Sequence, residues 1–207
     1  MIIEAVKKDK KHLTKVTCDN EYVFFLDNDV EDLPRLKSGM YLSNEYLKEL
    51  LQKSDYIRAK SKALWYLDRC DHTQKGLNYK LIKSGFSSQS ANKVIEKLKE
   101  LGLIDDRRFA FNFAEKCLKA NISQRQTYVK LLEKGIEKNL AKEAINSFET
   151  DEVSQIKAVV DKKYKNKISE KEGIAKVYAA LVRRGFSFDA VKEVLKQYSE
   201  ELKFAEE

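Results

Sequence analysis

The residues of this chain best suited to chemistry are cationic side chains that stand in pairs or close to tyrosine. Two arginine pairs, Arg107-Arg108 and Arg183-Arg184, lie in segments with helical patterns. Their positive charge makes them candidate contacts to an anionic partner such as the nucleic-acid backbone. A second candidate group combines cations with rings that can stack on bases; it consists of Tyr66, Arg69, Tyr79, Lys80 and Lys83.

Each of these candidates also has a purely structural explanation. Arg107 and Arg108 can pair with nearby Asp105, Asp106 or a neighbouring repeat. Arg183 and Arg184 lie in a last helical turn, where cations stabilise the helix dipole. The spacing of the aromatic residues favours core packing over base stacking for Trp65, and it places Phe109, Phe113 and Tyr178 in the core.

The sequence predicts a protein without catalytic, metal or cofactor chemistry. His12 and His72 stand far apart, with no cysteine or carboxylate cluster at ligand spacing. The phosphate-binding pattern GxxxxGK[ST] is absent, and nothing in the sequence brings serine, histidine and acid together as a triad. Three cysteines without short spacings predict no disulfide framework, and Cys117 falls on an apolar stripe. We therefore expect no cofactor and no metal. An enzyme whose catalytic groups converge from distant positions is the least favoured of the functions considered.

A short glycine-containing segment recurs at a fixed interval and defines the elements that position these residues. Gly85, Gly135 and Gly185 are 50 residues apart, and Phe86, Ile136 and Phe186 follow them. Apolar residues at helical spacing precede and follow each glycine, which indicates a helix, a sharp glycine turn and a second helix. Ser87 and Ser187 then stand where the next helix needs an N-cap, whereas Glu137 is a poorer cap.

Another helix precedes each of these pairs, so the pattern predicts three tandem three-helix repeats. Capping patterns at Ser123 and Ser169 predict where two of the middle helices begin, and Thr73 occupies the corresponding place in the first repeat. The predicted fold is mainly α-helical, with the repeats forming an elongated, curved array. The expected ranges are 56–104, 105–153 and 154–207.

The segment before the repeats has a different character. Residues 13–17 and 22–26 are β-prone and flank Asp19-Asn20, which predicts a hairpin, and residues 2–6 can add a third strand. Ser43 then begins a connecting helix. Residues 1–55 are therefore expected to form a small β element followed by a connecting helix.

The net charge of +7 is unevenly distributed along the 207 residues. Residues 1–57 hold 9 basic and 11 acidic residues, whereas residues 58–105 hold 10 basic and 5 acidic ones. All of the positive excess lies in the predicted repeats, which fits an anionic partner but also an ordinary solvated surface. No segment has the length and hydrophobicity of a membrane span or the pattern of a signal peptide, so we expect a cytoplasmic protein. We also expect a monomer.

The order and spacing of these motifs resemble those of the RecX family, bacterial modulators of the recombinase RecA. The stretch Leu103 to Ala110, followed by Glu133-Lys134-Gly135-Ile136, resembles the central RecX signature. Residues 177–191 resemble the C-terminal repeat of the family, and residues 63–67 through Phe86 its first repeat. The resemblance covers about residues 56–200; Asp71 to Gly76 and Asn121 depart from the family pattern.

The resemblance implies a regulator that acts without catalysis. Proteins of this family bind along the groove of the RecA filament on single-stranded DNA, inhibit ATP hydrolysis and strand exchange, and limit filament growth. RecA, single-stranded DNA and, as a further candidate, double-stranded DNA are the implied partners in recombination, DNA repair and the SOS response. Two other interpretations remain open: a general nucleic-acid-binding helical repeat protein that acts independently of RecA, and a scaffold that binds only proteins.

Overall fold

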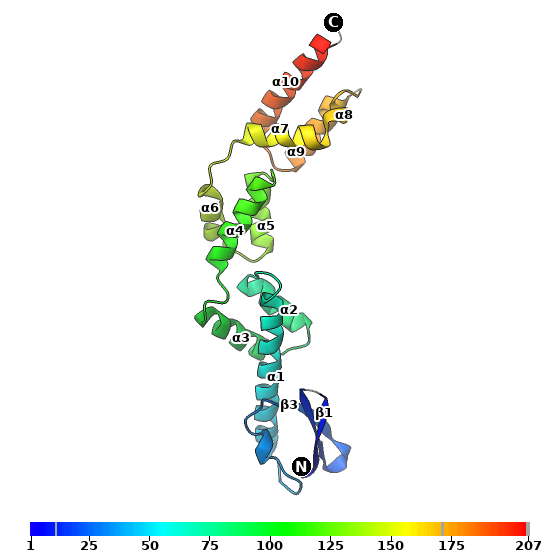
Figure 1. Ribbon diagram of the computed structural model, residues 1–207, viewed down its shortest axis with the longest axis vertical. Helices are drawn as coiled ribbons and strands as arrows, with labels where there is room; N and C mark the ends of the chain where they lie inside the picture. The colour runs from blue at the N-terminus through cyan, green and yellow to red at the C-terminus, as the bar shows by residue number, and fades with distance from the viewer. Residues whose placement is uncertain (11, 171, 206–207) are drawn as a thin grey trace. The chain divides into compact units, whose positions relative to one another are not determined.

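The computed structural model describes residues 1–10, 12–170 and 172–205, in which three strands precede ten helices (Figure 1). The predicted class, mainly α-helical with a small N-terminal β element, is confirmed. The chain divides into two compact units, Met1–Asp105 and Asp106–Glu207.

The first unit begins with a three-stranded antiparallel sheet of order β1-β2-β3. The strands are β1 (Ile3–Lys10), β2 (Leu13–Cys18) and β3 (Val23–Asp27). They confirm the predicted hairpin and its third strand. One face of the sheet is buried in an apolar core that includes Val16, Phe24 and Leu26, because side chains alternate between the two faces of a strand.

A single helix, α1 (Asn44–Leu67), links the sheet to the first repeat. Ser43 caps it by accepting a hydrogen bond from the Tyr46 backbone NH. The N-terminal half lies beside the sheet (Figure 1), where Leu47 and Leu50 join the core of the β element. The C-terminal half places Ala59 and Ala63 in the core of the first repeat. The connecting helix and the first helix of the repeat, expected as separate elements, are therefore continuous through residues 55 and 56.

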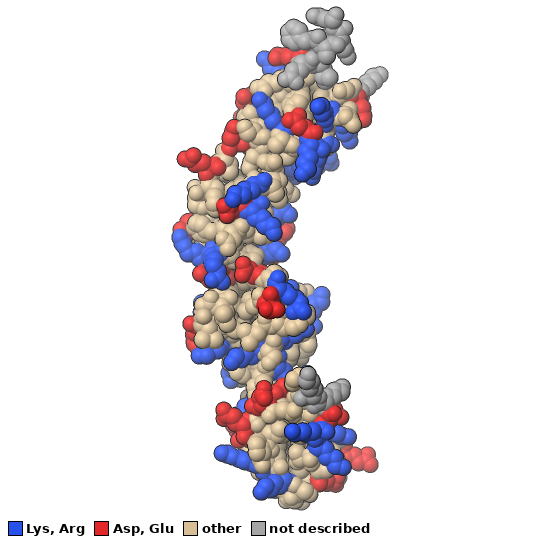
Figure 2. Space-filling view, viewed as in Figure 1, with Lys and Arg blue, Asp and Glu red and all other residues tan. Residues whose placement is uncertain are grey.

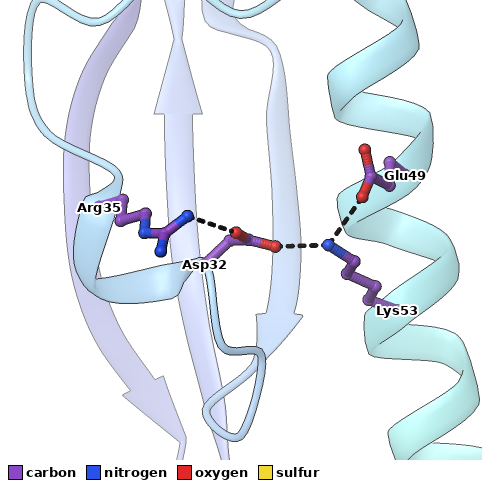
Figure 3. A network of polar contacts seen from close by, with 4 residues as sticks. All are labelled: Asp32, Arg35, Glu49 and Lys53. Atoms are coloured by element: carbon purple, nitrogen blue, oxygen red, sulfur yellow. Dashed lines mark hydrogen bonds and ion pairs between the residues drawn. The ribbon is translucent and has the colours of Figure 1, made fainter.

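Polar contacts fasten the segment after β3 to α1 (Figure 3). The Lys53 ammonium group lies 2.7 Å from a carboxylate oxygen of Asp32 and 2.7 Å from one of Glu49, and Arg35 approaches the other oxygen of Asp32 at 3.5 Å. The hydrogen bond from Lys53 holds the pKa of the Asp32 carboxyl below its usual value. The Ser54 hydroxyl, also on α1, accepts a hydrogen bond from the Asp27 backbone NH at 2.7 Å. The sheet is thus anchored to one face of the helix.

The first two repeats have the predicted three-helix form. The first is completed by α2 (Gln74–Lys83) and α3 (Ser88–Glu100), and the second consists of α4 (Asp106–Lys119), α5 (Gln124–Glu133) and α6 (Lys138–Asn146). Thr73 and Ser123 cap α2 and α5 through their side chains, as expected. Glu137 makes no side-chain cap at the start of α6, which agrees with its weaker capping chemistry.

The three glycine turns share one geometry. Gly85, Gly135 and Gly185 have φ angles of 91°, 90° and 84°, in the left-handed region that glycine tolerates best. After each glycine, the next backbone NH returns to the carbonyl group five residues earlier, as in the bond from Phe86 to Leu81. This is the Schellman arrangement that closes a helix. Asn121, which departs from the family pattern, also takes a left-handed conformation, with φ 55°.

The third repeat differs from the prediction. It contains α7 (Glu152–Lys163), the one-turn helix α8 (Lys165–Ile168), α9 (Gly173–Arg183) and α10 (Phe188–Ala205). Ser169 ends α8 instead of capping the middle helix, so the capping pattern expected there does not form. The middle helix begins at Gly173, 50 residues after Ser123, where a Cβ atom would overlap the Lys167 carbonyl oxygen.

Within the second unit, two hydrogen bonds join the second and third repeats. The Ser123 hydroxyl donates to the Arg184 carbonyl oxygen at 2.6 Å. The buried Gln155 side-chain amide donates to the Leu118 carbonyl oxygen at 3.2 Å. The α5 cap and the third glycine turn are therefore in direct contact.

Candidate functional site

Aromatic and cationic side chains gather around the C-terminal end of α1, and we call this group the aromatic–cationic cluster: Lys62, Trp65, Tyr66, Arg69 and Lys80. The Arg69 guanidinium carbon lies 3.4 Å from the centre of the Trp65 ring, and the Lys62 nitrogen lies 4.0 Å from it. Cations at such distances are attracted by the negative face of the ring. The Arg69 guanidinium also donates to the Trp65 carbonyl oxygen at 2.9 Å, which fixes its position.

Tyr66 connects this cluster to α2. Its ring lies 5.2 Å from Trp65 in an edge-to-face arrangement, and the Lys80 nitrogen lies 4.9 Å from its centre. Its hydroxyl is 3.1 Å from that of Ser84, which itself donates to the Lys80 carbonyl oxygen. The structure therefore brings together three of the predicted site residues, Tyr66, Arg69 and Lys80, from two helices.

Trp65, predicted to be in the core, is 46% exposed. The reason is its angular position on α1. Successive residues of an α-helix are rotated by about 100°, so Trp65 lies about 200° from buried Ala63, on the opposite face. The spacing of the buried alanines, Ala59 and Ala63, would have identified this exposed face from the sequence.

The remaining predicted residues of the first unit are solvent-exposed on α2. Tyr79 is 64% exposed, and Lys83 is exposed in the last turn of the helix. Residues four apart share one face of a helix, so Tyr79 and Lys83 are neighbours on α2. They extend the candidate surface beyond Lys80 with the same two kinds of side chain.

The arginine pair at the start of α4 has a different setting. Arg107 makes a two-pronged ion pair with Glu143 of α6, with Nη1 2.9 Å from Oε2, and its guanidinium carbon lies 5.0 Å from the Phe111 ring. The sequence left open that Arg107 has a structural role as one half of an ion pair. It forms such a pair with Glu143 of its own repeat. Arg108 is exposed. Phe109 and Phe113 stack at 5.7 Å and pack against the core of the second repeat, as predicted.

The second arginine pair ends α9. Arg183 is exposed in the last turn, where its charge complements the helix dipole. Arg184 is half-buried, its guanidinium carbon lies 5.8 Å from the Tyr164 ring, and its carbonyl oxygen accepts the hydrogen bond from Ser123. Arg184 therefore takes part in the contact between two repeats, while Arg183 faces solvent. Tyr178 packs against the core of the third repeat, as predicted.

The surface carries charges of both signs. Figure 2 shows lysine and arginine interspersed with aspartate and glutamate over the visible face of each unit. A candidate site is therefore identified by the arrangement of its side chains and not by the net charge of the protein.

No group of three or more potential metal ligands occurs among the described residues, and no helix in the described part of the chain is long and apolar enough to cross a membrane.

All three cysteines are free, and two are buried. Burial raises the pKa of the Cys18 and Cys117 thiols, which keeps them protonated. Cys117 behaves as the small buried hydrophobic residue that its place on the stripe predicted. The Sγ atom of exposed Cys70 lies 3.5 Å from Nε2 of His72, and the His72 and Tyr66 rings are nearly perpendicular, with their centres 6.0 Å apart.

Comparisons with known proteins agree with this architecture. Residues 59–98 match the family model described as the first three-helix domain of RecX, and residues 149–195 match that of the third. A regulatory protein RecX from Clostridium acetobutylicum is 31% identical over 206 residues, with 94% of each chain covered. Its counterpart from Caldanaerobacter subterraneus is 28% identical, covering 94% of this chain and 98% of the relative.

Solved structures share the fold. A crystal structure of regulatory protein RecX superposes with a TM-score of 0.66 at 20% identity and covers 93% of this chain and 98% of its own. The crystal structure of RecX from Lactobacillus salivarius gives a TM-score of 0.58 at 23% identity over 69% of this chain. At these identities, the likeness establishes a common architecture.

Proposed function

The chain belongs to the RecX family of regulatory proteins, and from this premise we propose that it is a non-enzymatic regulator of homologous recombination and DNA repair. In this role it binds the groove of the RecA filament on single-stranded DNA and inhibits ATP hydrolysis, strand exchange and filament growth. The observation that carries the proposal is the match, over 94% of each chain, to a regulatory protein RecX at 31% identity.

The aromatic–cationic cluster supports this proposal with suitable chemistry. Bases stack on aromatic rings with little regard to sequence, and cations beside the rings attract phosphates. Tyr66 and Trp65 supply the rings, and Arg69 and Lys80 supply the charges. Arg69 and Lys62 lie over the Trp65 ring, so a base stacks on Trp65 only when it displaces one of them. Exposed Arg108 and Arg183 are the further candidate contacts in the second unit. Arg107 and Arg184 are engaged with Glu143 and Tyr164, so their contribution requires those contacts to be exchanged.

A titration into RecA on single-stranded DNA tests the function. We expect ATP hydrolysis to slow at substoichiometric amounts of the protein. Arg69→Glu should weaken the inhibition, because it reverses the charge beside Trp65. Lys99→Glu is the matched control, since Lys99 is an exposed cation of the same repeat on α3. Unchanged hydrolysis across a wide range of wild-type protein would contradict the proposal.

The second candidate function is general nucleic-acid binding without regard to RecA, and the cluster favours it because stacking and charge suffice for bare single strands. Trp65 is the only tryptophan in the chain, so quenching of its fluorescence reports binding at the cluster directly. Salt-sensitive quenching by DNA together with unaltered RecA activity would favour this second function over the first.

A further inference from the structure

The outer face of the N-terminal sheet carries an ordered row of two lysines and a phenylalanine. Lys7 of β1 pairs with Lys15 of β2, which in turn pairs with Phe25 of β3. Their neighbours in sequence include Val16 and Phe24, which point into the core on the opposite face. All three side chains of the row are exposed, and Phe25 is 41% exposed.

The adjoining row of the same face carries no charge. It consists of Ala5, Thr17 and Val23, paired across the strands in the same order. Val23 is 37% exposed. The two rows therefore form a surface with Phe25 and Val23 at one edge, Lys15 beside the ring and Lys7 one strand further away. Acidic residues stand next to this surface, since exposed Asp9 follows Lys7 by two positions and buried Asp27 follows Phe25 by two.

The ordinary explanation for such lysines accounts for only one of them. Lysine on an edge strand prevents sheets from pairing with each other, and this covers Lys7 on β1. Lys15 lies on the central strand, which has no free edge. Like charges directly opposite each other also destabilise a sheet. Among the described residues, neither lysine has a carboxylate within ion-pair distance.

Phe25 also lines a groove that continues from the sheet to the first repeat, within the first unit. The groove has a volume of about 570 Å³, and its apolar lining includes Leu51 and Phe86. Lys48 and Arg58 lie at the same groove, with the Arg58 guanidinium carbon 6.0 Å from the centre of the Phe86 ring. The groove also contains the carboxylate of Asp55, which accepts hydrogen bonds from the backbone NH and the hydroxyl of Ser87. A ring with a cation near it thus occurs at both ends of this path, and at the groove end the charged Asp55 carboxylate offsets one of the two cations, Lys48 and Arg58.

We propose that the outer face of the sheet and the adjoining groove form a binding site for single-stranded nucleic acid. A base stacks on Phe25 while phosphates lie at Lys7 and Lys15, and the strand continues toward Arg58 and Phe86. The choice of nucleic acid over a protein partner follows from charge complementarity, because lysines next to an exposed ring match a chain that alternates phosphates with flat bases. This inference rests on the part of the proposed function in which the protein contacts single-stranded DNA, and it adds a second site outside the repeats.

The test measures binding of the full chain to fluorescently labelled oligo(dT) at several salt concentrations, without RecA. Phe25→Ala should weaken binding roughly tenfold, as expected for loss of one stacked base. Phe25→Leu keeps an apolar side chain but removes the ring, so it should weaken binding similarly without disturbing the sheet. Ultraviolet cross-linking followed by peptide mapping should place the DNA on the peptide that contains Phe25.

The lysine contribution has a matched control on the same sheet. Lys15→Gln should lower the slope of log affinity against log salt by about 0.7, the value for one phosphate contact on a single strand. Lys8→Gln removes the same charge from the opposite face of β1, because Lys8 pairs with the buried Thr14. It should leave the slope unchanged.

Two results would overturn this inference. One is an affinity for oligo(dT) that none of the Phe25 and Lys15 variants changes. The other is weakened inhibition of RecA by these variants with unaltered oligo(dT) binding, which would assign the surface to a protein partner. If the wild-type chain instead leaves RecA unaffected but binds oligo(dT) through Phe25, the proposed function fails and this inference stands.

Discussion

Replacing Gly185 with alanine should loosen the second unit more than the same change at Gly85 loosens the first. Both glycines have left-handed φ angles, 84° and 91°. Alanine in that conformation costs roughly 1 kcal/mol at either position. The surroundings differ. A Cβ atom at Gly85 would meet nothing within 4 Å, whereas one at Gly185 would lie 2.8 Å from the Ser123 hydroxyl oxygen.

The extra cost at Gly185 follows from the role of that hydroxyl. Ser123 is 2% exposed, and its oxygen both accepts from the Gln126 NH and donates to the Arg184 carbonyl oxygen. Moving it away breaks the hydrogen bond between the repeats, a loss of about 1 kcal/mol. We therefore expect Gly185→Ala to destabilise the contact between the second and third repeats by roughly 2 kcal/mol in total, against about 1 kcal/mol at Gly85.

Hydrogen–deuterium exchange on the full chain can separate the two effects by location. Gly185→Ala should accelerate exchange at the start of α5, at Gln126 and Thr127, in addition to its own turn. An increment of about 1 kcal/mol corresponds to roughly fivefold faster exchange. Gly85→Ala should act only at the turn between α2 and α3. Combining Gly185→Ala with Ser123→Ala should cost less than the sum of the two, because the crowded hydroxyl is gone. Equal local effects at both glycines, with α5 unchanged, would refute the reasoning.

Two further predictions concern the charged contacts. The pKa of Asp32 is lowered by its hydrogen bond from Lys53, so the stabilisation is complete above the ordinary aspartate pKa of about 4 and is lost as the pH falls through the lower folded value. Hydrogen exchange in β3 and the first half of α1 should rise in that acidic window. Lys53→Met should reduce this pH dependence, with a smaller part left by the contact of Asp32 with Arg35. The side chains of Arg107 and Glu143, which form an ion pair, are both exposed. Glu143→Gln should therefore change the free energy of unfolding, measured in urea, by less than about 1 kcal/mol. A larger loss of stability would show that the pair is structurally essential.

Local signals in the sequence predicted most of the fold. The glycine turns, the caps at Ser43, Thr73 and Ser123, and the three strands all depend on residues within a few positions of one another. The errors arose where tertiary packing decided the outcome. The helix α1 runs without a break through residues 55 and 56, where the sequence suggested a boundary, and next to this point buried Ser54 accepts a hydrogen bond from the Asp27 backbone NH. Ser169 had a capping pattern, but the close approach of Gly173 to Lys167 moved the start of the next helix.

The candidate site was predictable only in part, because residue types are local signals but the contacts between helices are not. Tyr66, Arg69 and Lys80 could be selected by residue type, and the packing of α1 against α2 then brought them together. The prediction that Trp65 lies in the core was wrong because it used the spacing of the aromatic residues and not the angle between Trp65 and the buried alanines of the same helix. The partner of Arg107 lies 36 residues away on another helix, and no local spacing indicates Glu143. The row from Lys7 to Phe25 depends on strand register, which residue type alone does not reveal.

The continuity of α1 determines how the two proposed binding surfaces of the first unit can act together. Its N-terminal half holds the sheet, and its C-terminal end carries Trp65 and Tyr66. A helix of 24 residues is about 36 Å long, and unlike a flexible linker it keeps its two ends at a fixed separation. Under the two proposals, we expect a nucleic-acid strand that is long enough to reach both surfaces to bind the second one as an intramolecular step, with a gain in avidity that a shorter strand cannot obtain. The sheet would then be a second point of attachment, and its rigid connection to the first repeat would make the affinity depend on strand length.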